Sequence, residues 1–204
     1  AASPHYGTGP GGDVSIAMGH EKRLETARFL KENGIELDIL PNAEHYVSPE
    51  LFERVAADAV VPIGGNSDWL LIELPWKPLS NPEEVLFRLQ MAGYKLLLAH
   101  PERYKYLEAD TVERLVHRGI KLQLELGSFV RVYGRRSRKR AVFFADNGWA
   151  HVLASDLHRP ADWLADSLKA VRKRYGSRGL KNALEENPRA LISNAGSDEV
   201  PAFV

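Results

Sequence analysis

The chain contains no cysteine, which excludes disulfide bonds, thiolate nucleophiles and cysteine-based zinc sites. A bound metal therefore needs histidine and carboxylate ligands, a set that suits manganese, zinc, iron or magnesium. Long apolar runs are also missing, since none approaches the ~20 residues of a membrane-spanning helix. The sequence therefore predicts no membrane span, and the lack of cysteine is typical of a cytoplasmic protein.

A net charge of either sign is missing too, because 27 Lys and Arg residues balance 27 Asp and Glu residues. Without an overall charge, the chain has no general attraction for nucleic acid or for an anionic membrane surface. We therefore expect no nucleic-acid partner.

What is present is an ordinary globular composition over 204 residues, of which 44% are hydrophobic and 26% charged. This length fits a single domain, which we expect to cover residues 1–204. The chain begins with Ala1 instead of methionine and has no signal-peptide pattern. We expect that an N-terminal segment belongs before it, and that the first βα unit of the domain is missing from this sequence.

Short apolar runs alternate with helix-like segments along the chain. The expected strands are 35–40, 69–74, 96–100, 120–126 and 149–154. The expected helices are 15–33, one that begins at 48, and then 81–93, 110–118, 137–147, 161–175 and 180–186. This alternation predicts an α/β fold with parallel strands, either a barrel or an open doubly wound sheet. Both place their active sites at the carboxyl ends of the strands.

Six side chains that can bind a metal lie at or just after strand-like runs: His5, Glu44, Glu73, His100, Asp156 and His158. We expect them to converge on one rim. Carboxylates such as Glu44 and Glu73 would repel one another there unless cations lie between them. In an extended segment, Asp156 and His158 would point to the same face. The sequence therefore predicts a centre with more than one divalent ion, suited to a phosphoryl group.

The stretch 96–104 holds the most specific arrangement. An apolar run leads to His100, Pro101 prevents further strand pairing, and Arg103 follows closely. A histidine at the end of a strand is a natural metal ligand, and a guanidinium suits a phosphate held by that metal. The alternative is a structural histidine beside a surface arginine.

A basic run contains six cations: Arg131, Arg135, Arg136, Arg138, Lys139 and Arg140. One interpretation is a basic rim that attracts an acidic phosphopeptide, with Arg135 and Arg136 as weak substrate contacts. The other is a solvated loop that continues into a helix, or the surface of an oligomer, so the oligomeric state stays open. We interpret His20, His117 and His151 as non-ligands, because they lie away from the strand ends.

Five motifs resemble those of one known family, in the same order: Ser3-Pro4-His5-Tyr6, Leu71-Ile72-Glu73, Ala99-His100-Pro101-Glu102-Arg103-Tyr104, Gly127-Ser128-Phe129 with Tyr133-Gly134, and Ala154-Ser155-Asp156-Leu157-His158. This is the polymerase-and-histidinol-phosphatase (PHP) superfamily, specifically its bacterial protein-tyrosine phosphatases of capsule and exopolysaccharide operons. The resemblance implies a PHP-type distorted (β/α)7 barrel with up to three divalent metal ions, commonly manganese. It also implies an enzyme that dephosphorylates the tyrosine-rich tail of a bacterial tyrosine kinase that controls polysaccharide synthesis.

The resemblance further implies metal-binding roles. Glu44 would bridge two metals, and Glu73 and His100 would complete the coordination of one of them. Asp156 would bind the second metal.

For the remaining residues, the resemblance implies that His5 and His158 bind a third metal. Arg103 would bind the phosphoryl oxygens and stabilise the charge that develops on them. A metal-bridged hydroxide would attack phosphorus in line, without a covalent phosphoenzyme.

The sequence departs from the family pattern in three places. The family begins with a strand that carries a His-x-His pair and a nearby aspartate, and this sequence has neither. The family arginine past the Asp-x-His motif has only Arg159 as a candidate, as a weak substrate contact. His45 beside Glu44 is unusual, and we expect it to be structural. Two alternatives therefore stay open: a PHP phosphoesterase for a small phosphorylated metabolite, and a catalytically impaired PHP module that binds a partner.

Overall fold

The computed structural model describes residues 4–6 and 15–204. Contacts between Cα atoms divide the chain into two compact units, Ala1–Leu96 with Ile192–Asn194, and Leu97–Leu191 with Ala195–Val204. The single domain over 1–204 stays a prediction. Ser3 of the first family motif lies outside the described residues.

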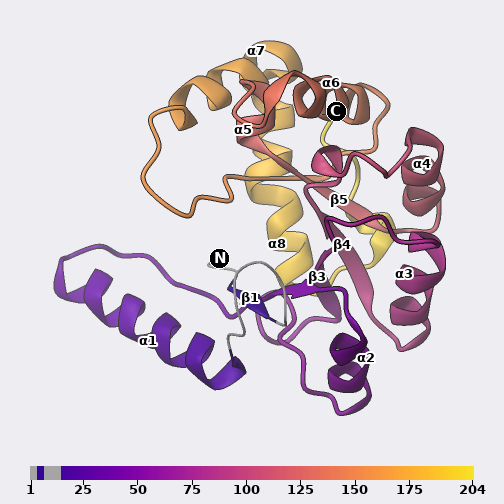
Figure 1. The fold of residues 1–204 in the computed structure, drawn as a ribbon. Coiled ribbons are helices and arrows are strands. Elements are labelled where there is room, and N and C mark those ends of the chain that lie inside the picture. The colour runs from indigo at the N-terminus through magenta and orange to yellow at the C-terminus, as the bar shows by residue number, and fades with distance from the viewer. Residues whose placement is uncertain (1–3, 7–14) are drawn as a thin grey trace. The chain divides into compact units, whose positions relative to one another are not determined.

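The first unit alternates strands and helices, and its elements are β1 His5–Tyr6, α1 Ile16–Glu32, β2 Glu44–Tyr46, α2 Pro49–Ala56, β3 Trp69–Glu73 and α3 Pro82–Met91 (Figure 1). The three strands pair in parallel, with His5 opposite Glu44 and Glu44 opposite Leu71. β3 is buried along its whole length and forms the core together with Leu51 of α2 and Leu86 of α3.

The local sequence explains where these helices begin and end. Proline occupies the first turn of both α2 and α3, where its missing N–H costs no helical hydrogen bond. The Asn81 side chain accepts a hydrogen bond from the Glu84 N–H at 3.1 Å and so caps α3. Gly93 follows α3 with φ of 96°, a conformation that favours glycine. The predicted helices that begin near 48 and 81 are therefore confirmed.

The strand expected at 35–40 is wrong. Residues 35–43 are irregular, and the strand lies at Glu44–Tyr46 instead. The apolar side chains that suggested the earlier strand are largely exposed, at 48% for Ile35 and 62% for Leu37. They therefore do not pack on a sheet in the way that alternation along a half-buried strand requires.

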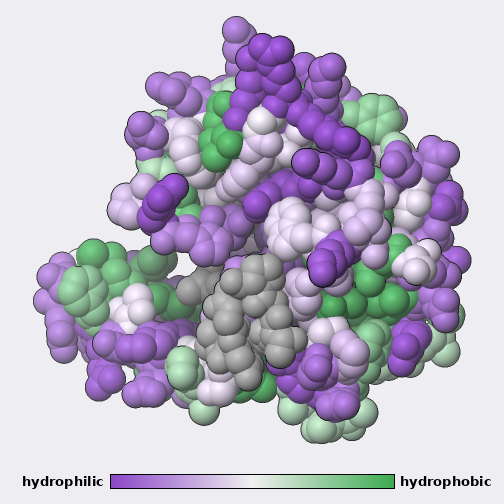
Figure 2. All heavy atoms as spheres, viewed as in Figure 1, coloured by the Kyte–Doolittle hydropathy of each residue, from purple (hydrophilic) through white to green (hydrophobic). Residues whose placement is uncertain are grey.

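Helix α1 is amphipathic only weakly, and each of its residues is at least partly exposed. Met18, Leu24 and Phe29 are among its exposed apolar side chains, and Figure 2 shows green surface over this helix. Its attachment includes a hydrogen bond from Arg23 Nη1 to the Ile39 carbonyl at 3.0 Å.

β4 Lys95–Ala99 leads into the second unit, whose further elements are η1 Pro101–Arg103, α4 Ala109–His117, β5 Lys121–Glu125, α5 Leu126–Phe129, α6 Gly134–Asp146, β6 Val152–Ala154, α7 Leu164–Lys181, η2 Asn182–Glu186, α8 Asn187–Ile192 and η3 Ser197–Glu199. β5 pairs in parallel with both β4 and β6. Because the strands are parallel in each unit and alternate with helices, the predicted α/β fold is confirmed.

The helices of the second unit differ from expectation at two places. α6 begins at Gly134 and so includes most of the basic run. The two helices expected at 161–175 and 180–186 correspond to α7 and the π-helical segment η2, with a break inside α7 at Gly176, where φ is 76°. Among the described residues, no helix combines the length and the hydrophobicity that a membrane span requires.

Candidate metal centre

The described residues contain two groups of side chains whose donor atoms lie within 4.8 Å of one another. The first group consists of His5, Glu44 and Glu73, and belongs to the first unit. The second group consists of His100, Glu125 and Asp156, and belongs to the second unit. Five of the six predicted ligands therefore lie in one or other group. That all of them share one rim stays a prediction.

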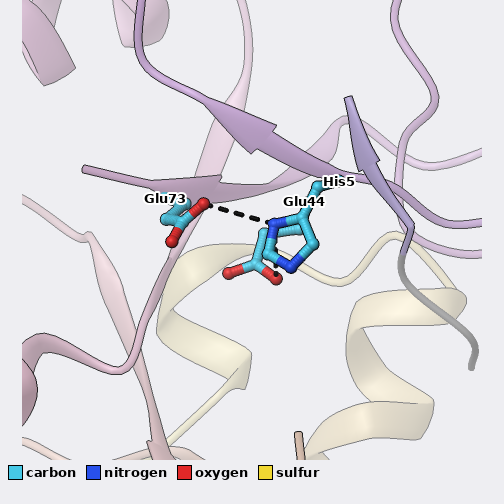
Figure 3. A group of neighbouring side chains, drawn as sticks. All are labelled: His5, Glu44 and Glu73. Carbon is cyan, nitrogen blue, oxygen red and sulfur yellow. Dashed lines mark ion pairs between the residues drawn. The ribbon is translucent and has the colours of Figure 1, made fainter. Parts of the chain in front are cut away.

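Strand register explains how the first group forms. His5 lies opposite Glu44 in the parallel pairing, and Glu44 lies opposite Leu71. Glu73 follows Leu71 by two positions on β3, so its side chain points to the same face of the sheet as that of Leu71. Three consecutive strands thus direct one side chain each toward a common point, as Figure 3 shows.

The charges of the first group fit a divalent cation. His5 Nδ1 lies 3.3 Å from Glu73 Oε2 and 3.8 Å from Glu44 Oε2. The two carboxylate side chains are only 5% and 3% exposed. Two nearly buried carboxylates this close together repel each other, and a cation between them removes that cost. One imidazole and two carboxylates are also the ligands that zinc, manganese and iron accept.

The side chain of His45 points to the opposite face of β2 from that of Glu44, as expected for consecutive residues in a strand. Its ring is buried, with Nε2 3.1 Å from the Val61 carbonyl oxygen and 3.3 Å from the Val61 nitrogen. Burial lowers the pKa of His45 to about 4. The structural role predicted for this histidine is supported by these contacts.

The second group is built at the ends of the strands of its own unit. His100 directly follows β4, and its backbone N–H donates to the Gln123 carbonyl at 2.8 Å. Glu125 is the last residue of β5, and Asp156 follows β6. His100 and Asp156 both have positive φ, 36° and 46°. Such a backbone is uncommon for residues other than glycine and is frequent at functional sites.

Burial and a neighbouring charge both affect the pKa of the Glu125 carboxyl. Burial, with the Glu102 carboxyl close by, raises the pKa of Glu125 to about 7. Glu102 is itself buried and accepts hydrogen bonds from the Glu125 N–H at 3.0 Å and from Ser128 Oγ at 2.7 Å. Glu102 therefore fixes the end of β5. A cation held by Glu125 would offset the cost of its buried charge, so this group also fits a metal.

Arg103 lies against the second group. Its Nη1 donates to Glu125 Oε1 at 2.6 Å and lies 3.5 Å from Asp156 Oδ2. The guanidinium carbon stands 4.2 Å from the centre of the Tyr133 ring. The predicted phosphate-binding arginine is thus placed directly beside two candidate metal ligands, and a permanent positive charge there suits an anionic substrate.

His158 lies outside both groups. Its side chain is 66% exposed, and Nδ1 lies 3.0 Å from the Asp156 carbonyl oxygen. The extended conformation predicted for residues 156–158 is wrong, because the positive φ of Asp156 turns the chain there. The metal-binding role of His158 stays a prediction.

The basic run divides into two kinds of side chain. Arg136, Arg138 and Arg140 donate to backbone carbonyls, and Arg140 reaches those of Pro101, Glu102 and Leu107 at 2.6–3.3 Å. Arg135 is exposed, as is Arg159. Arg140 thus holds the turn that carries Arg103, and the substrate contacts expected of Arg135, Arg136 and Arg159 stay predictions.

The remaining histidines also lie outside both groups. His20 and His117 belong to α1 and α4. His151 is buried, and its Nδ1 accepts a hydrogen bond from the Leu122 N–H at 3.2 Å. Burial lowers the pKa of His151 to about 3. That the three are non-ligands stays a prediction.

Sequence reasoning missed Glu125, and it named Tyr133 only as part of a family motif, without a role. Glu125 ends β5 in the same way that Glu73 ends β3, so its position at the carboxyl end of a strand was a usable signal. Tyr133 gave a weaker signal, because its contact with Arg103 depends on a turn between α5 and α6.

The chain is similar to several curated tyrosine-protein phosphatases. The tyrosine-protein phosphatase YwqE of Bacillus subtilis is 26% identical over 199 residues, which are 95% of this chain and 77% of YwqE. The tyrosine-protein phosphatase CpsB of Streptococcus pneumoniae is 28% identical over 184 residues, 84% of this chain and 75% of CpsB. The putative tyrosine-protein phosphatase CapC of Staphylococcus aureus is 26% identical over 166 residues, 80% of this chain and 62% of CapC.

Among solved structures, the fold is similar to a chain from the crystal structures of YwqE from Bacillus subtilis and CpsB from Streptococcus pneumoniae, described as unique metal-dependent tyrosine phosphatases. The TM-score is 0.82 at 25% identity, over 95% of this chain and 79% of that chain. The family model "Capsular polysaccharide synthesis, CpsB/CapC" matches residues 1–193. The resemblance that the motifs indicated is therefore confirmed, and the chain belongs to the CpsB/CapC family.

Proposed function

We propose that this chain is a metal-dependent phosphotyrosine-protein phosphatase that acts in the cytoplasm. Its substrate would be the phosphorylated tyrosine-rich tail of a tyrosine kinase that controls exopolysaccharide or capsule synthesis. The observation that carries the proposal is the position of Arg103, whose guanidinium lies 2.6 Å from one carboxylate of a histidine–carboxylate group. The names of the relatives YwqE and CpsB support the same activity.

The metal would be manganese, held by the two groups already described. His5, Glu44 and Glu73 offer one set of ligands, and the second group offers another. His158 would add a further ligand through a change in its exposed side chain. A bound divalent cation supplies Lewis-acid charge for the phosphoryl oxygens and lowers the pKa of water enough for attack at neutral pH.

The protein side chains would bind and orient the phosphoryl group. Arg103 is held by Glu125, and its planar guanidinium has the donor geometry that matches phosphate oxygens. The charge that builds on those oxygens in the transition state would be stabilised by the same guanidinium. Cysteine is missing from the chain, so thiolate nucleophiles are excluded.

Recognition of the protein substrate would depend on exposed cations. Arg135 and Arg159 are exposed and would attract an acidic phosphopeptide, while Arg136 would contribute from its place on α6. The Arg136 side chain donates to the Lys105 carbonyl at 2.8 Å, so its contribution would be that of a fixed charge.

The deciding experiment is hydrolysis of a phosphotyrosine peptide with and without manganese, next to a phosphoserine peptide of the same sequence and a small phosphate monoester. The proposal expects manganese-dependent turnover of the phosphotyrosine peptide well above the other two. Preference for the small ester would identify a metabolite phosphoesterase. Metal binding without turnover of any of the three would identify a binding module, and both results would contradict the proposal.

A further inference from the structure

The guanidinium of Arg103 has an aromatic neighbour, Tyr133, whose hydroxyl is hydrogen-bonded to Glu125 of the second group. Its central carbon lies 4.2 Å from the centre of the Tyr133 ring, within the range of a cation–π contact. Arg103 also donates to Glu125 at 2.6 Å. The side chain is therefore held at its edge by a carboxylate and across its face by a ring.

Tyr133 is held in place by the turn between α5 and α6. Within this turn the Val132 N–H donates to the Gly127 carbonyl at 3.0 Å, and the Arg131 N–H donates to the Ser128 carbonyl at 3.3 Å. Arg131 has φ of 70°, which completes a tight reversal of the chain. The backbone thus delivers Tyr133 to a fixed position.

Gly127 provides the surface on which the Tyr133 ring rests. A Cβ atom at Gly127 would lie 3.0 Å from Tyr133 Cε2 and 3.3 Å from Trp163 Cη2. Such distances are shorter than ordinary van der Waals contact, so any larger residue would push the ring away. The ring is consequently packed between the backbone of α5 and the guanidinium of Arg103.

The contact between Tyr133 and Arg103 matters because Glu125, the carboxylate that holds Arg103, is also a candidate metal ligand. Glu125 belongs to the second group, and a carboxylate that holds a cation offers less charge to a neighbouring guanidinium. The Glu125 and Asp156 oxygens both lie near Nη1, at one corner of the guanidinium, whereas a flat ring across its face fixes its plane.

We propose that Tyr133, seated on Gly127, is a positioning residue that holds the Arg103 guanidinium in the plane that receives phosphoryl oxygens. The proposal rests on the role given to Arg103 in the proposed function. It assigns the effect to the ring of Tyr133, and Tyr133→Phe separates the ring from the hydroxyl, which bonds Glu125.

The test measures binding of inorganic phosphate to the manganese-loaded protein by calorimetry, together with manganese content and turnover of the phosphotyrosine peptide. Tyr133→Leu removes the ring and is expected to weaken phosphate binding about tenfold, as loss of a partly desolvated cation–π contact does. Tyr133→Phe keeps the ring and is expected to stay within about twofold of the wild type. Manganese content is expected to be equal in all three proteins.

A double-mutant cycle tests whether Tyr133 affects phosphate binding through Arg103. In a chain that already carries Arg103→Ala, the change Tyr133→Leu is expected to have no further effect on phosphate binding. Gly127→Ala is the second variant, because it keeps Tyr133 but displaces its ring by a few tenths of an ångström. It is expected to weaken phosphate binding about threefold, again in the range of a partial loss of that contact.

Three results would overturn the proposal: unchanged phosphate binding in Tyr133→Leu, an equal loss in Tyr133→Phe, or additive losses in the cycle. A wild-type protein that does not bind phosphate would overturn it as well. Wild-type protein that binds phosphate but does not hydrolyse the phosphotyrosine peptide would refute the proposed function alone. The binding measurements would then still decide the role of Tyr133.

Discussion

Each of the two groups contains one histidine and two carboxylates, but their charges are balanced differently. In the first group, the His5 imidazole lies 3.3 Å from Glu73. In the second group, the Arg103 guanidinium lies 2.6 Å from Glu125. An imidazole loses its proton near neutral pH, whereas a guanidinium stays charged. The first group therefore depends more strongly on a bound cation, and the second group combines a cation site with a permanent anion-binding charge.

Loss of a carboxylate from the first group is expected to have the largest effect. Glu73→Gln removes a metal ligand, so bound manganese should fall by about one ion per chain and peptide turnover about a thousandfold. Elemental analysis and initial rates measure both. Glu53→Gln, which changes an exposed carboxylate on α2, is the matched control and should leave both unchanged. Full manganese content in the Glu73→Gln protein would remove this residue from the metal site.

Loss of the guanidinium from the second group is expected to separate catalysis from metal binding. Arg103→Ala should lower turnover a few hundredfold, the usual range for a group that stabilises transition-state charge, and should leave manganese content intact. Arg103→Lys should recover only part of the rate, because an ammonium cannot make two parallel hydrogen bonds to phosphate. If Arg103→Ala keeps wild-type turnover, the role given to this arginine is wrong.

A buried histidine of the second unit gives a pH effect that does not involve either group. The pKa of His151 is lowered by burial from 6.5 to about 3, so the unfolded chain binds more protons below pH 6.5. The stabilisation is complete above pH 6.5 and is lost as the pH falls, by about 3 kcal/mol between pH 6.5 and pH 4. Urea unfolding of metal-free protein across this range measures it. His151→Gln should reduce the slope but not remove it, because the lowered pKa of the buried His45 contributes a slope of the same sign. An unchanged slope would refute the assignment.

The smallest expected effect compares two arginines on α6. Arg140 donates to three carbonyls around the turn that carries Arg103, so Arg140→Ala should cost about 2 kcal/mol of unfolding free energy. Arg135 is exposed, and Arg135→Ala should cost less than about 0.5 kcal/mol. Thermal unfolding of the two variants measures the difference. Equal stability losses would show that the carbonyl contacts of Arg140 contribute little.

Elements with local start and stop signals could be predicted from the sequence, and elements that depend on pairing could not. Asn81 and Pro82 define the start of α3 through their own chemistry. The strand at Glu44–Tyr46 is short and polar, and only its pairing with β1 and β3 distinguishes it from the more apolar segment 35–40.

The same distinction applies to the candidate site. Residues at the carboxyl ends of strands, such as Glu73 and His100, could be found because the end of an apolar run is visible in sequence. Residues 156–158 were expected to be extended, and they are not, because the positive φ of Asp156 cannot be inferred from residue type. His158 Nδ1 still lies 3.9 Å from Asp156 Oδ1. The contact between Tyr133 and Arg103 joins two segments through a turn geometry that no local pattern specifies.

The parallel register of β2 limits where the chain tolerates insertions and deletions. Glu44 faces the first group because it lies opposite His5, and His45 is buried on the other side. One residue added within β2 would exchange these two faces and place a neutral imidazole where a carboxylate now stands. Residues 35–43 are irregular and carry no such register. The chain can therefore change length at the exposed residues 35–38 at little cost, but not at the buried Asn42 and Ala43 or between Glu44 and Tyr46.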